Sequence, residues 1–297
     1  MTNNGFSQSD MNFSREGKMF LYWGYNFSAY TNSDIHFWGN GYSFTITDIK
    51  AGDEQTTSIH TYIQPKTITV PQYNLRIGYF LDNNWFISLG WDHMKYVMSE
   101  QSTHLTGTIA SGNDKAGSYI NKEVLVGEFS DETESAPKNI NVLQRGFVPQ
   151  YEQCDGLSDL SFEFGKYKQL WISRNGGKAF SVFGTLGTGI EITDTECNVL
   201  GAYDAHHSAK AHSNGSHPEE DALQGKKGWH PTGYGLSTSV GVQFDFSKNF
   251  FFQTRLKGGF IDLWFVHTTH EGGRASQHFG FVEPMFVIGY SCKAHKN

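Results

Sequence analysis

The sequence predicts an all-β protein, a transmembrane antiparallel up-and-down β-barrel of eight strands. Several segments alternate strictly between apolar and polar residues, as expected of strands with lipid on one side and a polar lumen on the other. Aromatic residues make up 15% of the chain, and 33 glycines stand against only 7 prolines. Aromatic side chains favour pleated surfaces and barrel girdles. No run of about 18 apolar residues exists, so a closed barrel is the remaining way to satisfy the backbone inside a bilayer.

The clearest strand covers residues 234–246. One face carries Tyr234, Leu236, Thr238, Val240, Val242, Phe244 and Phe246, and the other carries Gly235, Ser237, Ser239, Gly241, Gln243 and Asp245. Typical soluble strands have about 5 to 6 residues. A tilted strand needs roughly 9 to 11 residues to cross a bilayer, so this segment is long enough to span one.

Seven further segments follow the same pattern, and turns join most of them in pairs. The expected strands lie at residues 21–28, 72–81, 85–92, 160–165, 180–191, 234–246, 250–261 and 282–290. Only Ser247, Lys248 and Asn249 separate two of them, and a turn this short fixes both register and neighbour. The alternative fold is a soluble β-sandwich, whose strands also alternate but are shorter and whose loops need not gather at one end.

Long connections alternate with the short turns. They cover about residues 31–66, 99–156, 193–232 and 264–275. In outer-membrane barrels short turns face the periplasm and long loops face outside, so we expect both termini in the periplasm. Residues 42–49 and 104–109 are expected to extend strands above the membrane. The expected organisation is a flexible polar segment at 1–18, one barrel at 19–291 and a short tail at 292–297.

Charge and the N-terminal segment bear on location and partners. The net charge of -7 leaves no basic stripe to neutralise phosphates, so we expect no nucleic-acid partner. The expected partners are outer-membrane lipid, including lipopolysaccharide, and other envelope proteins. Residues 1–18 lack the apolar core of a secretory signal, so export would require a processed N-terminus.

Ten polar side chains are expected to point into the lumen. They are Asn26, Arg76, Asp92, Glu163, Glu191, Gln243, Asp245, Arg255, Lys257 and Glu283. An eight-stranded barrel is just wide enough for its own side chains to fill. Charges of both signs should pair there, because an unpaired buried charge is costly. The interior is therefore expected to be plugged, with a path for protons or small ions as the alternative.

Five short motifs carry a family resemblance. They are YWGYN (22–26), SDIHF (33–37), NLRIGYF (74–80), DHMKYVM (92–98) and ASQHF (275–279). Through them the chain resembles a family of uncharacterised outer-membrane β-barrel proteins widespread in Bacteroidetes-type bacteria, over about residues 20–290. The resemblance implies the fold and the location but no catalytic residue. The chain departs from the family pattern in a His-rich insertion and in its tail, residues 291–297.

The His-rich insertion is a candidate metal site. It holds His206, His207, His212, His217 and His230 beside several carboxylates. Imidazole and carboxylate together suit zinc, copper or nickel, but the spacing is irregular. A solvated mobile loop and a partner contact are the alternatives, and no other cofactor is expected.

The cysteines suggest one disulfide. Cys154 lies before the fourth strand and Cys197 after the fifth, so a barrel brings both to the outer rim. An oxidising compartment would permit a bridge that closes a loop of about 43 residues. Cys292 should sit at the opposite end and remain unpaired. The alternative is two separate thiols.

One set of residues has the composition of a hydrolase site. Ser276 and His278 share the lipid-facing side of the last strand, and Asp262 shares that side on the strand before. Two residues along a strand are too far apart for a direct hydrogen bond without a bend, and rim polar residues often contact lipid headgroups. We therefore expect no enzyme but a surface or structural barrel, or a subunit of an outer-membrane complex. A narrow solute channel and a lipid-A acyl hydrolase are the alternatives.

Overall fold

The computed structural model describes residues 13–56, 58–127, 146–203, 229–269 and 271–294. Most of these residues belong to antiparallel strands. The elements are β1 (Lys18–Asn26), β2 (Ala29–Tyr30), β3 (Ser33–Gly39), β4 (Tyr42–Ile49), β5 (Ala51–Gly52), α1 (Ile59–Ile63), β6 (Tyr73–Phe80), β7 (Trp85–Met98), β8 (Gln101–Ile109), β9 (Gly117–Val126), β10 (Gln150–Ile172), β11 (Ala179–Val199), β12 (Ala202–Tyr203), β13 (His230–Asp245), β14 (Phe250–His267) and β15 (Arg274–Lys293). Within these ranges no helix is long and apolar enough to cross a bilayer.

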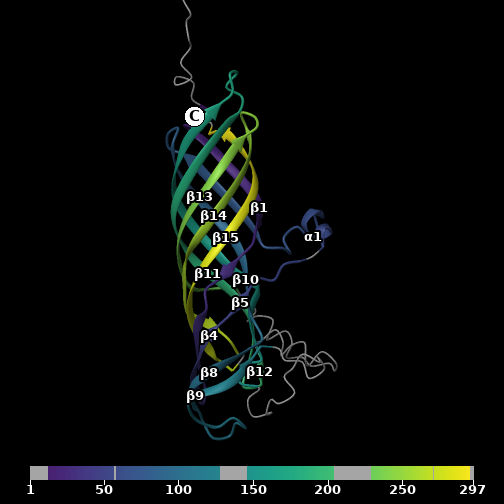
Figure 1. The fold of residues 1–297 in the computed structure, drawn as a ribbon, viewed down its shortest axis with the longest axis vertical. Coiled ribbons are helices and arrows are strands. Elements are labelled where there is room, and N and C mark those ends of the chain that lie inside the picture. Colours follow the sequence, from purple (N-terminus) through teal and green to yellow (C-terminus); the bar gives the residue numbers. More distant parts are fainter. Residues whose placement is uncertain (1–12, 57, 128–145, 204–228, 270, 295–297) are drawn as a thin grey trace, which may run out of the picture.

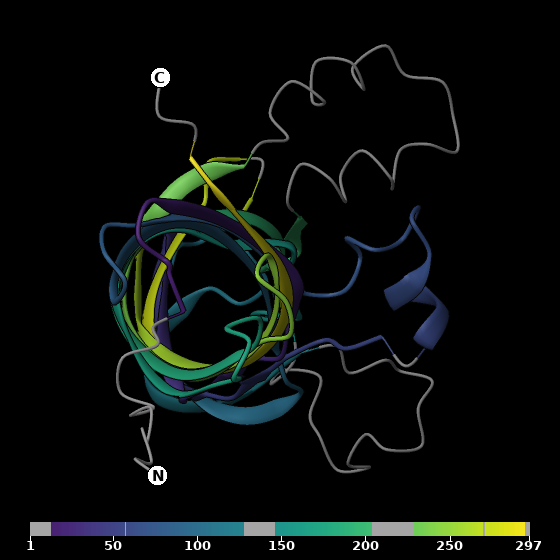
Figure 2. The ribbon, with the colours of Figure 1, turned by 90° about the horizontal axis from the view of Figure 1, so that it is seen from above.

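Eight of the strands form a closed ring. Their order is β1-β6-β7-β10-β11-β13-β14-β15, and antiparallel pairing of β1 with β15 closes the circle. Figure 1 shows the tilted strands from the side, and Figure 2 shows the ring along its axis. The all-β barrel predicted from the alternation is thereby confirmed, and the alternative of a two-layer sandwich is wrong.

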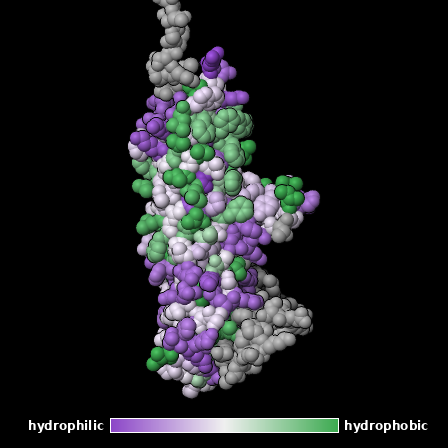
Figure 3. Space-filling view, in the orientation of Figure 1, coloured by the Kyte–Doolittle hydropathy of each residue, from purple (hydrophilic) through white to green (hydrophobic). Residues whose placement is uncertain are grey.

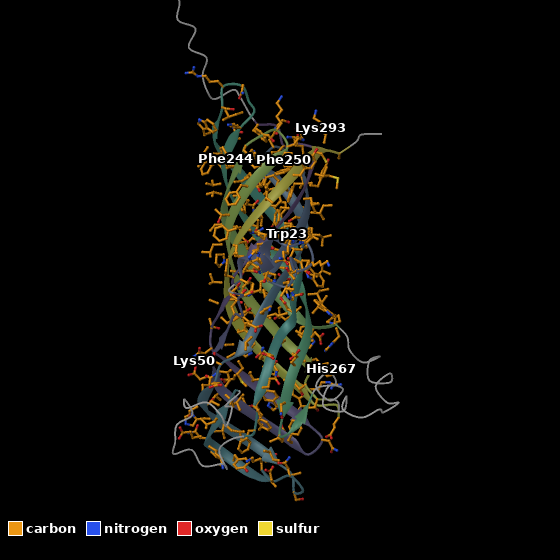
Figure 4. All side chains as sticks on the ribbon, turned by 90° about the vertical axis from the view of Figure 1, so that its right-hand side faces the viewer. Trp23, Lys50, Phe244, Phe250, His267 and Lys293 are labelled. Carbon is orange, nitrogen blue, oxygen red and sulfur yellow. The ribbon has the colours of Figure 1, made fainter. Side chains whose placement is uncertain are left out.

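The two ends of the barrel differ. The three short turns and both ends of the described chain gather at one end, where the Ala294 amide donates a hydrogen bond to the Gly17 carbonyl at 3.0 Å. We call this the turn end and the opposite one the loop end. Phe244, Phe250 and Lys293 mark the turn end in Figure 4, whereas Lys50 and His267 lie toward the loop end.

The N-terminal segment enters the turn end. The prediction of a flexible segment over residues 1–18 is wrong for residues 13–17, which are packed against the barrel. The Arg15 guanidinium lies 2.6 Å from Asp245 inside the lumen, and the Phe13 amide donates to Gln169 at 2.8 Å. The physical reason is that the inward-facing Asp245 is nearly fully buried, so Arg15 compensates its charge.

A broad apolar belt covers the outside of the ring. Its exposed residues include Leu21, Leu75, Ile77, Leu89, Phe162, Phe164, Leu186, Leu236, Val240, Phe252, Leu256, Phe286, Ile288 and Tyr290. Figure 3 shows apolar residues gathered over the half nearer the turn end and hydrophilic residues over the other half. Soluble monomers rarely expose apolar patches above a few hundred Å². A closed ring with such a belt is a transmembrane barrel of the outer-membrane type.

Beyond the belt, four further strands continue the same sheet. The loop-end part of β15 pairs with β3, followed by β4, β8 and β9 in that order. A parallel bridge between Val126 and Val148 brings β9 next to the segment that precedes β10. We call β3, β4, β8 and β9 the platform. It contains both segments, 42–49 and 104–109, that the sequence predicts to extend above the membrane.

The barrel strands also run farther than the alternation predicts. β10 begins at Gln150, β11 reaches Val199 and β13 begins at His230, so each shortens an expected long loop. β14 and β15 leave only residues 268–273 between them. These extensions bury a large apolar cluster, which includes Met94, Tyr96, Tyr151, Leu157, Val199, Leu263 and Phe279. Burial of this cluster stabilises paired strands well outside the belt.

Candidate functional site

The interior is filled in three layers, of which the middle one is charged. The ten residues that the sequence predicts to point inward all lie inside the barrel, and Arg255, at 4%, is the most exposed of them. Alternation places them there because successive side chains of a strand point to opposite faces. Eight charged residues make up what we call the charged layer. They are Arg76, Asp92, Asp159, Glu163, Glu191, Arg255, Lys257 and Glu283.

Two arginines connect distant strands through one glutamate. On β10, Glu163 Oε1 lies 2.7 Å from Arg255 Nη2 of β14 and 3.3 Å from Arg76 Nη2 of β6. Arg76 also pairs with Asp92 at 3.2 Å, and Arg255 donates to the Tyr22 hydroxyl at 2.8 Å. Since β6, β10 and β14 are not neighbours in the ring, these contacts run across the lumen.

Lys257 joins two further carboxylates. Its Nζ lies 2.7 Å from Asp92 Oδ2 and 2.6 Å from Asp159 Oδ2. The sequence prediction omits Asp159 because the expected strand begins at residue 160. Asp159 nevertheless has the same parity as Glu163, so extending the alternation by one residue would have found it. On the neighbouring strand β15, Glu283 is the direct partner of Lys257 and accepts a hydrogen bond from the Asn26 amide.

Acidic groups outnumber basic ones in the charged layer. Asp92, Asp159 and Glu191 are direct partners on the neighbouring strands β7, β10 and β11, so three inward carboxylates form one row. Lys257 bridges the first two, whereas neither oxygen of Glu191 has a hydrogen-bond partner among the described groups. With three cations against five carboxylates, the layer has more acidic groups than cations to pair with them.

Aromatic rings close the lumen near the turn end. This apolar layer, which we call the plug, consists of Phe20, Tyr22, Phe80, Phe86, Tyr167, Phe183, Phe251 and Val287. Four of its phenylalanines lie on glycines directly opposite in the neighbouring strand. The pairs are Phe20 on Gly78, Phe86 on Gly165, Phe183 on Gly241 and Phe251 on Gly289. A Cβ atom at any of these glycines would overlap the ring, so the glycines make the room that the plug occupies.

An apolar core closes the loop end. Phe37 of the platform packs edge-on against Tyr151 at 5.5 Å between ring centroids, and Tyr96 lies 5.0 Å from Phe279. All four rings are buried. The platform therefore covers the loop end of the lumen with a packed core. Together with the plug and the charged layer, it places buried side chains at three levels of the described interior.

The candidate hydrolase residues lie on the outside of the wall and are only partly brought together. Asp262 and His278 are direct partners on β14 and β15, but Ser276 is paired with His36 of the platform. No hydrogen bond joins these three candidates, all of which the structure describes. His278 borders a surface cavity of about 300 Å³ whose described lining does not include Ser276. The geometry thus provides no contact between a nucleophile and a base.

The structure describes the side chains of Cys197 and Cys292 but not that of Cys154. Cys197 is fully buried next to Tyr151 of β10, but the Cys154 side chain lies outside the described residues, so the disulfide stays a prediction. Cys292 is an exposed free thiol near the turn end.

Most of the His-rich insertion lies outside the described residues. This applies to His206, His207, His212 and His217. His230 is described, at the start of β13, with its ring 4.1 Å from that of His267. Within the described part of the chain no three metal-ligating side chains form a group. Metal binding by the insertion therefore stays a prediction.

Comparisons with known proteins concern the fold. No family model matches the chain, and no curated protein matches its sequence. Outer membrane protein OprG of Pseudomonas aeruginosa is 10% identical with a TM-score of 0.40, over 94% of this chain and 98% of OprG. Outer membrane protein AlkL in lipid bilayers is 9% identical with a TM-score of 0.36, over 100% and 99%. The outer membrane protease OmpT of Escherichia coli is 7% identical with a TM-score of 0.33, over 93% and 96%. The resemblance to a Bacteroidetes-type family stays a prediction.

Proposed function

We propose that this protein is an integral outer-membrane barrel with a sealed lumen that acts through its loop end, as a surface protein or as a subunit of an envelope complex. The observation that carries the proposal is the filled interior, with the plug, the charged layer and the platform core stacked along one axis. A barrel that transports solutes needs a continuous path. A barrel that presents a surface needs a rigid anchor, and cross-lumen ion pairs and packed rings provide one.

The platform supports the second half of the proposal. Four strands extend the wall beyond the belt, although a membrane anchor needs only the spanning part. On β9, Ile120 is 87% exposed and marks the outer surface of the platform. The platform thus presents an ordered surface of paired strands beyond the belt, as a surface protein or a complex subunit requires.

The orientation that follows has the platform outside the cell and both termini in the periplasm. An Ile120→Cys variant and the native Cys292 mark the two ends, since both side chains are exposed. Both proteins carry Cys154→Ser, which removes the other cysteine expected at the outer rim. On intact cells, a membrane-impermeant maleimide should then label Ile120→Cys and leave the Cys154→Ser parent unlabelled. Permeabilised cells should label the parent at Cys292. Labelling of the intact parent would reverse the orientation.

Conductance measurements test the sealed lumen. In a planar bilayer the purified protein should insert without steady conductance, and a general porin added afterwards verifies that the bilayer reports open pores. A steady current through the parent would favour the narrow channel instead.

Purification in mild detergent tests the complex-subunit form of the proposal. A partner that binds the platform should accompany the parent and be lost from an Ile120→Asp variant that keeps the heat-modifiable mobility of a folded barrel. If both proteins purify alone, the complex-subunit form is wrong and the surface-protein form is retained.

Lipid A composition tests the hydrolase alternative. Because Ser276 does not contact His278 or Asp262, cells that carry the parent or Ser276→Ala should give identical lipid A mass spectra. A deacylated species that disappears with Ser276→Ala would establish an enzyme and contradict the proposal.

A further inference from the structure

One segment, residues 53–72, projects sideways from the barrel wall, and we call it the excursion. Between β5 and β6 the chain runs outward, forms α1 and returns, and Figures 1 and 2 show α1 standing clear of the ring. In Figure 3 it projects at the level where the apolar belt gives way to the hydrophilic half. Membrane–water interfaces of outer-membrane barrels lie at this kind of boundary.

The apolar face of the excursion has no protein cover. α1 contains no buried residue, and Ile59 and Ile63, four positions apart on one helix face, are 68% and 66% exposed. Val70, just before the return to β6, is 50% exposed. A helix of five residues is not stable by itself in water.

Polar contacts nevertheless give the excursion a defined shape. The Tyr62 hydroxyl donates to Gln55 Oε1 at 3.0 Å, and the Thr67 hydroxyl donates to the Thr61 carbonyl at 3.2 Å. The segment is therefore held in place by its polar groups while its two isoleucines remain exposed.

A lipid-facing tyrosine sets the height of the excursion on the barrel. Tyr25 points outward from β1, and its hydroxyl donates to the Tyr62 carbonyl at 2.5 Å while the two rings pack edge-on at 4.9 Å. Tyr25 is also the direct strand partner of Phe286 in the belt, and Trp23 packs against it at 4.6 Å. The excursion is thus continuous with the lipid-contacting surface and attached at an aromatic girdle.

The charges of the excursion fit a lipid surface. The excursion begins with two carboxylates next to the wall, Asp53 and Glu54, of which Glu54 pairs with Lys95 of β7 at 3.3 Å. The part that follows, residues 58–70, contains Lys66 and His60 but no aspartate or glutamate. Cations beside exposed apolar side chains are typical of segments that lie in the headgroup region of an anionic leaflet.

We propose that residues 58–70 are a membrane-interface anchor, with Ile59 and Ile63 inserted into the hydrocarbon edge of the leaflet nearer the loop end and Lys66 at the phosphate level. The occupant of the apolar face is lipid. The anchor would fix the depth and tilt of the barrel on one side, independently of what the platform binds.

Fluorescence quenching tests the insertion in the full-length protein. Ile63→Cys is labelled with an environment-sensitive fluorophore after Cys292→Ser, and the Cys292→Ser parent treated with the same reagent provides the blank. In vesicles of phosphatidylglycerol and phosphatidylcholine that contain spin-labelled lipid, quenching should approach that of Leu186→Cys, a belt residue that is 70% exposed. The matched control is Ile120→Cys on the platform, which should stay unquenched.

Two results would overturn the anchor. Quenching as weak as that of Ile120→Cys with water-like emission places the face in solvent. Blue-shifted emission without lipid quenching means that a second copy or another protein covers it.

Hydroxyl-radical footprinting of the unmodified protein provides a test without substitutions. In the bilayer, Ile59 and Ile63 should be oxidised several-fold less than Ile120, although all three are exposed on the protein itself. Equal oxidation of the three isoleucines contradicts the proposal.

Discussion

Lys257 shows, at the scale of single residues, what holds the charged layer together. Its ammonium group is fully buried and contacts Asp92 and Asp159 at once. Replacing a whole buried ion pair by apolar residues is often neutral, but removing one partner leaves an uncompensated charge. Lys257 is the shared partner of two carboxylates in an acid-rich layer. Its removal should therefore destabilise the barrel more than removal of a surface cation.

Lys257→Met should lower the free energy of unfolding by about 3–5 kcal/mol. Urea unfolding in lipid vesicles, followed by tryptophan fluorescence, measures the change. The control is Lys95→Met, since Lys95 pairs with Glu54, whose side chain is 60% exposed. That pair should be worth about 0–1 kcal/mol. Adding Asp159→Asn to Lys257→Met should restore part of the loss, and equal effects of the two lysine substitutions would contradict the assignment.

At the scale of elements, a phenylalanine on one strand repeatedly lies over a glycine on the neighbouring strand. Each of the four Phe–Gly pairs joins two adjacent strands at the level of the plug, and the ring covers backbone that glycine leaves bare. The arrangement explains how a chain rich in both residue types fills a narrow barrel. It also fixes register, because a slip of one residue would move each ring from the lumen to the lipid side.

Gly78→Ala should destabilise the barrel by about 1–3 kcal/mol, because a Cβ there overlaps the Phe20 ring and overpacking forces the ring from its place. Gly52→Ala in β5 is the matched control, with no atom within 4 Å of the added Cβ. It should change stability by less than about 0.5 kcal/mol. The same urea titration measures both variants, and similar losses for the two would show that the plug adapts freely.

The loop end of β14 should respond to pH. His267 lies beyond the belt and its side chain is partly exposed. Partial burial, with the nearby His230 and Arg274, holds its pKa at about 4, below the ordinary 6.5. The locally unfolded state then binds a proton that the folded state excludes, so local stability is present above pH 6.5 and falls as the pH falls toward 4.

Hydrogen exchange of residues 263–267 measures this response. Protection, corrected for intrinsic rates, should drop between pH 7 and pH 5 in the parent and much less in His267→Gln. A pH-independent parent would contradict the assignment.

At the scale of the whole molecule, side-chain alternation predicts the ring and its lumen because a period of two assigns each residue to a face without knowledge of its partner. Arg15 has no such signal, because it reaches Asp245 from a segment that does not alternate. The order of the platform strands also cannot be predicted from the sequence alone. β15 pairs with β3, and β4 with β8, across long sequence separations, so their register depends on the packed core rather than on turn length.

The three layers lie in series along one path, so breaching one of them should not open the barrel. Lys257→Met removes a cross-lumen contact, and Phe86→Ala removes one ring of the plug. Either variant should remain without steady conductance in a planar bilayer, because the platform core still covers the loop end. Heat-modifiable mobility verifies that each variant is folded. A steady current through Lys257→Met alone would show that the charged layer is the only barrier, and the protein would then be a narrow channel rather than a sealed barrel.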